Sequence, residues 1–180
     1  MVLIILSNGF EDAEAIVPHD ILMRGGAHVR FVSAEPSSQV TSARGIALSA
    51  DCVLENVSPG KDDTVIIPGG SKGVAGILSN RRALDLIADA HHKGACLAAI
   101  CAGPTVLARL GITDGKNVTC YPGCEQQMGS AICHADKSVC QDGKLITARA
   151  AGSSFDFGFV VLEAVVGKPA ADKVRAEMVY

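Results

Sequence analysis

The feature that most constrains the fold of this chain is a repeated alternation of short apolar runs with longer, helix-like segments. Apolar runs of strand length occupy Val2–Leu6, His28–Ala34, Thr64–Pro68 and Ala95–Ile100. Helical patterns occupy Ala13–Arg24, Asn80–Lys93, Gly103–Leu110, Ser153–Val166 and Pro169–Met178. Buried strands that alternate with helices form a mostly parallel central sheet with helices on both faces. The pattern therefore predicts one α/β domain over residues 1–180, an ordinary domain size.

Turn-forming residues and one proline refine this prediction. Pro18 lies inside the first helical pattern, where a proline removes a backbone donor, and it predicts a kink near Ile16. Residues 36–62 are rich in Ser, Asp and Gly, and they predict a short β-hairpin around Gly45. A second hairpin is predicted at 141–143, where the sequence is Gln-Asp-Gly.

Composition narrows the classes of function. Hydrophobic residues make up 48% of the chain and charged residues 19%, which excludes intrinsic disorder. The net charge of −3 and the absence of Trp argue against a nucleic-acid-binding surface. The opening apolar run is too short to span a bilayer and lacks a basic leader, and no later run reaches about 18 apolar residues. We therefore expect a cytoplasmic protein with no nucleic-acid or membrane partner, whose seven cysteines are free thiols.

Cys101 stands where an apolar strand runs directly into a helix. Ala99 precedes it by two residues and Gly103 follows it by two, which is the spacing of a nucleophile elbow, where larger side chains would collide. A thiol at a helix N-terminus faces unpaired N–H groups, so its pKa is expected to fall from about 8.5 toward 7. The sequence predicts that Cys101 is reactive and that the other six cysteines are ordinary thiols.

Two loops are predicted to lie beside Cys101 at the carboxyl edge of the sheet, where open α/β sheets bind ligands. Pro-Gly-Gly at 68–70 ends the preceding strand, and the N–H groups of Gly70 and Ala102 could together form an oxyanion hole. Glu14, at the start of the first helix, could turn toward the same edge. Neither G-x-x-x-x-G-K-[ST] nor G-x-G-x-x-G occurs, so a phosphate cradle is not indicated.

These motifs together resemble the ThiJ/PfpI superfamily, the DJ-1/PfpI family. The resemblance rests on Ala-Ala-Ile-Cys-Ala-Gly-Pro at 98–104, Pro-Gly-Gly at 68–70 and Gly-Phe-Glu-Asp-Ala-Glu-Ala at 9–15. Arg-Gly at 44–45 and Ile-Thr-Ala-Arg at 146–149 extend it over essentially the whole chain. Within the family, the chain resembles the branch that contains the parkinsonism-associated protein deglycase. The resemblance implies a flavodoxin-like sandwich, a homodimer, and no metal or organic cofactor.

The resemblance also implies roles for individual residues. Cys101 is expected to be the reactive, oxidisable residue, with Glu14 hydrogen-bonded to its sulfur, and Tyr121 and Gly69 are expected to line the pocket. Tyr121 stands where this branch commonly has a histidine, and Ala102 follows Cys101 where protease-like members have one. A Cys-His dyad is therefore not visible, which weakens a cysteine peptidase or amidase assignment.

The leading hypothesis is detoxification of small carbonyl compounds, of the glyoxalase III or protein deglycase type. Cys101 would add to an α-oxoaldehyde such as methylglyoxal, or to its early adducts on thiols and amines. Glu14 would move protons between the adjacent carbons, and hydrolysis would release a 2-hydroxy acid such as lactate. This substrate class comes from the resemblance, whereas the sequence itself supplies only the activated thiol.

Two alternatives remain open at this point. In the first, the protein is an oxidative-stress sensor or a redox-regulated chaperone in which Cys101 is oxidised without turnover. Cys120 or Cys124 could then act as a resolving thiol for Cys101. In the second, a structural zinc ion is held by a set drawn from Cys120, Cys124, Cys133, His134 and Cys140.

Self-association is expected through the first helix and the neighbouring hairpin. Arg24 and Arg44 could meet near that interface and hold an anion, or they could be two solvated surface arginines.

Overall fold

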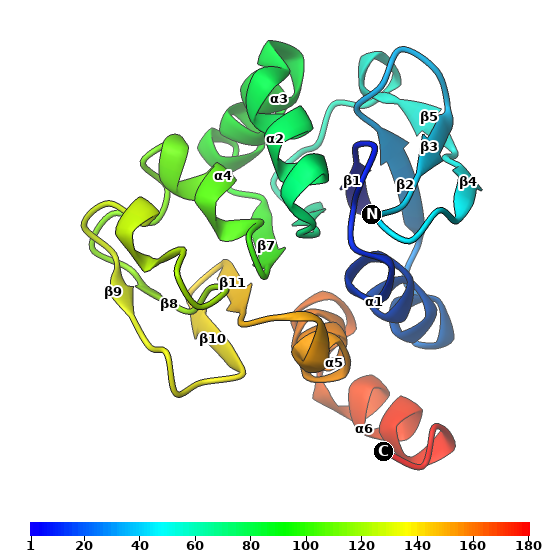
Figure 1. Ribbon diagram of the computed structural model, residues 1–180. Coiled ribbons are helices and arrows are strands. Elements are labelled where there is room, and N and C mark those ends of the chain that lie inside the picture. Colours follow the sequence, from blue (N-terminus) through cyan, green and yellow to red (C-terminus); the bar gives the residue numbers. More distant parts are fainter.

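The computed structural model describes every residue from Met1 to Tyr180. Figure 1 shows a curled central sheet with helices on two sides of it. The strands are β1 Val2–Leu6, β2 Val29–Ser33, β3 Gln39–Thr41, β4 Ala47–Ser49, β5 Cys52–Val53, β6 Thr64–Ile67, β7 Cys96–Ile100, β8 Asn117–Val118, β9 Ile132–Cys133, β10 Val139–Asp142 and β11 Leu145–Ala148. The α-helices are α1 Asp12–Arg24, α2 Ser71–Ser79, α3 Arg81–His92, α4 Pro104–Arg109, α5 Ser154–Val166 and α6 Lys168–Glu177.

The main sheet has seven strands in the order β10-β11-β7-β6-β1-β2-β5. All neighbours pair in parallel except the edge strand β10, which runs antiparallel to β11. The predicted flavodoxin-like α/β architecture with a mostly parallel sheet is confirmed. Because β6 lies between β1 and β7, the loops that follow these three strands meet at one edge of the sheet.

The core has two halves, one on each face of the sheet. Strand β1 contributes to both because successive side chains point to opposite faces: Leu3 joins one cluster and Ile4 the other. Helices α2, α3 and α4 cover the first face, and helices α1, α5 and α6 cover the second. Every helix in the structure is too short or too polar to span a membrane.

The predicted hairpins are present, whereas one helix was not anticipated. Strands β3 and β4 pair antiparallel around Gly45, and β10 and β11 pair across a turn at 143–144. Helix α2 was missed because Gly73 and Gly76 lower its helix propensity. A Cβ on Gly73 would lie 2.9 Å from the backbone of Phe10, so this glycine lets α2 pack against the first loop.

Pro18 lies inside α1, but the helix is continuous from Asp12 to Arg24. The expected kink near Ile16 therefore does not break the element. Pro18 is buried where α1 packs on α5. A Cβ placed on Gly158 of α5 would lie 3.2 Å from the Cα of Pro18. The proline thus lies at a close contact between the two helices.

Candidate active site

The turn that carries Cys101 has an unusual backbone conformation. Cys101 follows the last residue of β7 and has a φ of 65°, in the left-handed region that non-glycine residues seldom adopt. Two residues later, Gly103 has no room for a side chain, because a Cβ would collide with the carbonyl oxygens of Ile67 and Ile100. Helix α4 begins immediately afterwards with Pro104. The strand-to-helix turn is therefore the predicted nucleophile elbow, with the thiol held at the carboxyl edge of the sheet.

The Gly69-Gly70 turn after β6 joins the elbow to α1. The Gly69 N–H donates to Oε2 of Glu14 at 2.7 Å. A Cβ on Gly69 would lie 2.6 Å from that oxygen and 2.7 Å from the Cβ of Cys101. The backbone N–H groups of Gly70 and Ala102 face the Cys101 sulfur and act to lower its pKa. The structure therefore brings together the predicted residues Cys101, Glu14, Gly69, Gly70 and Ala102.

Glu14 is completely buried, although it stands in the first turn of α1. Its Oε1 has no hydrogen-bond partner, and a buried carboxylate oxygen without a donor is costly. Burial raises the pKa of Glu14 from 4.5 to about 7, although hydrogen bonds from Gly69 and Cys101 oppose the change. Near neutral pH this carboxyl group is thus able both to give and to take a proton.

The thiol of Cys101 differs from the sequence-based expectation. Burial and the nearby Glu14 carboxylate together raise its pKa to about 12, and the amides of Ala102 and Gly70 oppose the change by less. The expected fall toward 7 is therefore wrong, because α4 has only six residues and cannot offset desolvation and a neighbouring negative charge. The two groups titrate as a pair, so the loss of the first proton near pH 7 opposes the loss of the second.

Tyr121 reaches the site through its backbone. Its N–H donates to the carbonyl oxygen of Cys101 at 2.8 Å, while its side chain is exposed. The backbone at Tyr121 is thus fixed to the elbow, while the phenol is open to solvent. The sequence did not indicate this backbone contact, because nothing in the residue pattern around Tyr121 marks it.

The other cysteines are free thiols, as expected. The zinc hypothesis is not supported, since no group of three or more His, Cys, Asp or Glu side chains is arranged to hold a metal ion. The ring of His134 instead bonds to Oδ1 of Asn117 at 2.8 Å.

Arg24 and Arg44 lie at different ends of α1. Arg24, in the last turn of the helix, pairs with Asp20 at 2.9 Å. Arg44, beside the first turn, lies 3.7 Å from Glu11. Within one chain the two arginines do not share a site, so a joint anion site would require a second copy of the chain.

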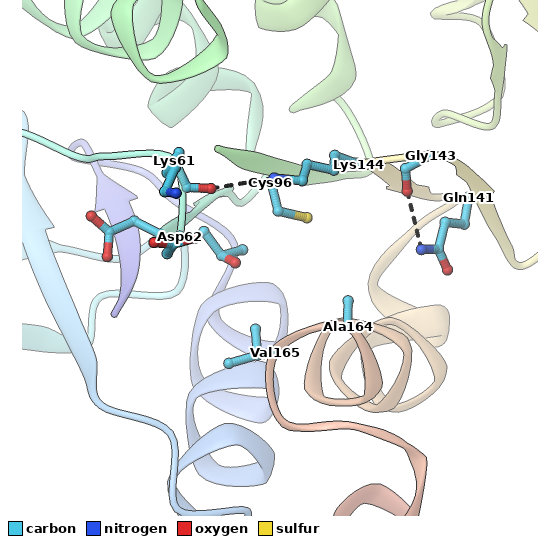
Figure 2. Close-up of a pocket in the computed structure, with 10 residues that line it drawn as sticks. Lys61, Asp62, Cys96, Gln141, Gly143, Lys144, Ala164 and Val165 are labelled. Carbon is cyan, nitrogen blue, oxygen red and sulfur yellow. Dashed lines mark hydrogen bonds between the residues drawn. The ribbon is translucent and has the colours of Figure 1, made fainter. Parts of the chain in front are cut away.

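A separate cavity of about 450 Å³ lies at the opposite edge of the sheet (Figure 2). Its walls include Thr64 and Cys96, the first residues of β6 and β7, and Lys144 from the β10–β11 turn. Parallel sheets bind ligands at the carboxyl ends of their strands, whereas this cavity meets the parallel strands β6 and β7 at their amino ends. We therefore take the elbow at Cys101, and not this cavity, as the candidate active site.

Comparison with known proteins gives consistent matches along the chain. The model of the DJ-1/PfpI family matches residues 1–164. The chain is 36% identical over 180 residues to protein DJ-1alpha of Drosophila melanogaster, covering 99% of this chain and 83% of that protein. It is 30% identical to a protein named as a deglycase from Pyrococcus abyssi, covering 86% and 92% of the two chains. The crystal structure of Drosophila melanogaster DJ-1beta superposes with a TM-score of 0.92 at 32% identity, covering 99% and 96%.

Proposed function

Because this chain belongs to the DJ-1/PfpI family, we propose that it is a cysteine-dependent enzyme that converts reactive α-oxoaldehydes to 2-hydroxy acids. Methylglyoxal, and its early adducts on thiols and amines, are the proposed substrates, with lactate as the product. The observation that supports this most is a buried Glu14, with a pKa of about 7, beside the Cys101 thiol. The relative named as a deglycase adds support for the substrate class.

The first step joins the thiol to the aldehyde. The sulfur of Cys101 attacks the aldehyde carbon, and its proton passes to the Glu14 carboxylate as the carbon–sulfur bond forms. Such a concerted transfer lets a thiol with a high pKa react, because the proton leaves only as the new carbon–sulfur bond is made. The product is a hemithioacetal, whose hydroxyl takes up the proton.

The second step moves hydrogen between the two adjacent carbons of the substrate. Glu14 removes the proton from the carbon bonded to sulfur and returns it to the neighbouring ketone carbon, while the proton of the hemithioacetal hydroxyl passes to the ketone oxygen. The hemithioacetal thereby becomes a thioester of a 2-hydroxy acid, with no change in the number of atoms or electrons. Water then hydrolyses the thioester, releasing lactate and the free thiol of Cys101. The N–H groups of Gly70 and Ala102, which point at the sulfur, can stabilise negative charge beside it.

The experiment measures lactate formed from methylglyoxal by the wild type, Cys101→Ser and Glu14→Gln. Cys101→Ser is expected to abolish turnover, and Glu14→Gln to lower it by about 10²–10⁴-fold, the usual contribution of a general acid–base group. Cys140→Ser serves as a control, because Cys140 is a buried thiol on β10, away from the elbow. Equal rates in the wild type and Cys101→Ser would end the proposal.

One observation favours a second function, that of an oxidation sensor or redox-regulated chaperone. The amides of Gly70 and Ala102 converge on the sulfur itself, where they could hold the oxygens of a sulfinate. A protonated Glu14 could donate a third hydrogen bond. Low doses of peroxide, followed by intact-mass measurement, distinguish the two functions. A protein that gains two oxygens at Cys101 but forms no lactate is a sensor.

We further propose that the protein is a homodimer and works in the cytoplasm. Exposed apolar side chains on α1 and on the β3–β4 hairpin support self-association. Seven free cysteines suit a reducing compartment.

A further inference from the structure

The polar cavity at the amino ends of β6 and β7, here called the amino-edge cavity, takes no part in the proposed chemistry. Its volume is about 450 Å³, and it lies between the β10–β11 turn, the start of β6 and the last turn of α5. Pockets that bind small molecules commonly measure about 300–1,000 Å³. The amino-edge cavity thus has room for a ligand of two or three amino-acid residues, larger than the α-oxoaldehydes proposed for the elbow.

The upper wall of the cavity in Figure 2 carries two lysines whose charges are not balanced. Nζ of Lys144 donates to the carbonyl oxygens of Gly94 at 2.6 Å and Lys61 at 3.3 Å. These bonds hold the ammonium group in place, but neither partner is a carboxylate. Lys61 also lines the cavity, and neither lysine takes part in an ion pair. Two positive charges are therefore available to the anionic groups of a ligand.

The remaining walls of the cavity supply negative charge and apolar surface. Ala164 and Val165 line it from the last turn of α5, where the final carbonyl groups of the helix carry partial negative charge. Asp63 is neutralised by the amino group of Met1, 2.9 Å from its Oδ1. Asp62 lines the cavity without an ion-pair partner. The cavity therefore combines one free carboxylate and a helix C-terminus with two free lysines.

These charges indicate what a complementary ligand carries. The free side chains are two cations, Lys61 and Lys144, and one anion, Asp62, which match a ligand with two carboxylates and one ammonium group. Gln141 donates to the carbonyl oxygen of Gly143 at 3.2 Å, and its amide oxygen can still accept from a peptide N–H. We propose that the amino-edge cavity binds a short acidic peptide with two carboxylates and one ammonium group. The carboxylates pair with the lysines, and the ammonium group lies near Asp62 and the end of α5.

Cys96 provides a built-in reporter of this binding. In Figure 2 its side chain points from the sheet into the cavity, toward Ala164 and Val165. Its neighbour on β6, Thr64, is only 4% exposed and lines the same wall. Burial raises the pKa of the Cys96 thiol, so its alkylation is slow enough to follow. A bound peptide covers this thiol and slows its alkylation further.

Calorimetric titration with S-methylglutathione, a tripeptide with two carboxylates, one ammonium group and no free thiol, tests the proposal. Saturable binding is expected, and Lys61→Met and Lys144→Met should each weaken it about tenfold by removing a charge-assisted hydrogen bond. Lys173→Met should bind as the wild type does, because Lys173 pairs with Glu177 on α6 and does not line the cavity. The diethyl ester and the N-acetyl derivative of the same peptide should bind more weakly, and this comparison needs no substitution in the protein.

Brief treatment with N-ethylmaleimide, followed by peptide mapping, locates the bound peptide. S-methylglutathione should slow the labelling of Cys96 and leave that of Cys101 unchanged. Protection of Cys101 instead of Cys96 would overturn the proposal. So would the absence of saturation up to about 10 mM, or equal binding by the wild type and Lys61→Met. Because none of these measurements involves lactate formation, their outcome is independent of the proposed enzymatic activity.

Discussion

At the scale of single residues, the chemistry of the site depends on one buried carboxyl group and one thiol that share a small volume. A thiol alone in this position would be sluggish at neutral pH, because burial raises the pKa of Cys101 to about 12. In the proposed mechanism, Glu14 changes this behaviour by accepting the thiol proton during attack. The reactive unit is therefore the pair, and its pH dependence belongs to both groups.

Glu14 should make the stability of the fold depend on pH. Its pKa is about 7 in the folded protein and 4.5 ordinarily, so the folded state binds more protons between these two values. The corresponding stabilisation is complete below pH 4.5 and is lost as pH rises through about 7, a change of about 3 kcal/mol. Glu14→Gln, which can still accept from Gly69, should lack this loss and be more stable than the wild type at pH 8.

Urea unfolding at pH 4.5 and pH 8 checks this prediction. The two proteins should differ little at the lower pH and by about 3 kcal/mol at the higher one. Glu55→Gln is a suitable control, because Glu55 is an exposed carboxyl group. A Glu14→Gln advantage that is the same at both pH values would contradict the assignment of this carboxyl group as the titrating residue.

The residues of the site could be predicted from sequence better than their electrostatics. The alternation of strands and helices placed the ends of β1, β6 and β7 side by side, which brings Glu14, Gly70 and Cys101 together. The pKa of Cys101 could not be predicted in the same way, because burial and the orientation of the Glu14 carboxyl group depend on tertiary packing. A helix N-terminus favours a thiolate, but here burial and the Glu14 carboxylate have the larger effect on the pKa of Cys101.

At the scale of elements, the contact between α1 and α5 has almost no free space. A Cβ on Gly158 would lie 2.7 Å from Cδ1 of Ile21 and 3.2 Å from Cα of Pro18. Gly158→Ala should therefore destabilise the protein by about 1–3 kcal/mol through overpacking. This cost exceeds the gain of about 1 kcal/mol that alanine brings to a helix interior.

Thermal or urea unfolding of Gly158→Ala measures this balance. Gly152→Ala provides the matched control, because a Cβ there would meet nothing within 4 Å and its φ is not positive. The control should stay within about 0.5 kcal/mol of the wild type. If Gly158→Ala were as stable as the control, the two helices would have to separate more easily than the packing indicates.

Elements with strong periodic patterns were predictable, and elements defined by tertiary contacts were not. The segments now seen as β1, β2, β6, β7, α1 and α3 carry clear apolar patterns, and none of their predicted bounds differs from the observed one by more than one residue. The glycines of helix α2 allow it to pack closely against other segments, and no local sequence pattern reveals this role. The strands β5, β8 and β9 have only two residues each, too few for any period to be read.

At the scale of the whole molecule, the distribution of exposed apolar side chains indicates where a second copy would bind. Ile16 and Met23 lie seven residues apart on α1 and are 40% and 51% exposed. Residues seven apart share a face of a helix. Ile46, on the hairpin, is also exposed, and Ala43 N is bonded to Phe10 O just before α1. These three side chains define the proposed dimer face.

Sedimentation velocity of the wild type and of Met23→Glu tests this face. The wild type is expected to sediment as a dimer, and the variant to sediment as a monomer with an unchanged circular dichroism spectrum. Ile132→Glu is a fair control, since Ile132 is equally apolar and is 54% exposed on β9. Dimers that survive Met23→Glu but are lost in Ile132→Glu would place the interface elsewhere.

The turn at Gly69-Gly70 has a consequence for any attempt to engineer this protein. The Gly69 N–H binds the Glu14 carboxyl group and the Gly70 N–H faces the Cys101 sulfur, so two consecutive peptide units align the two groups. A shift of this turn would change the environment of both groups together. Substitutions there should show strong epistasis with changes at Glu14 and Cys101, so that a library must vary all of these positions jointly to find new specificities.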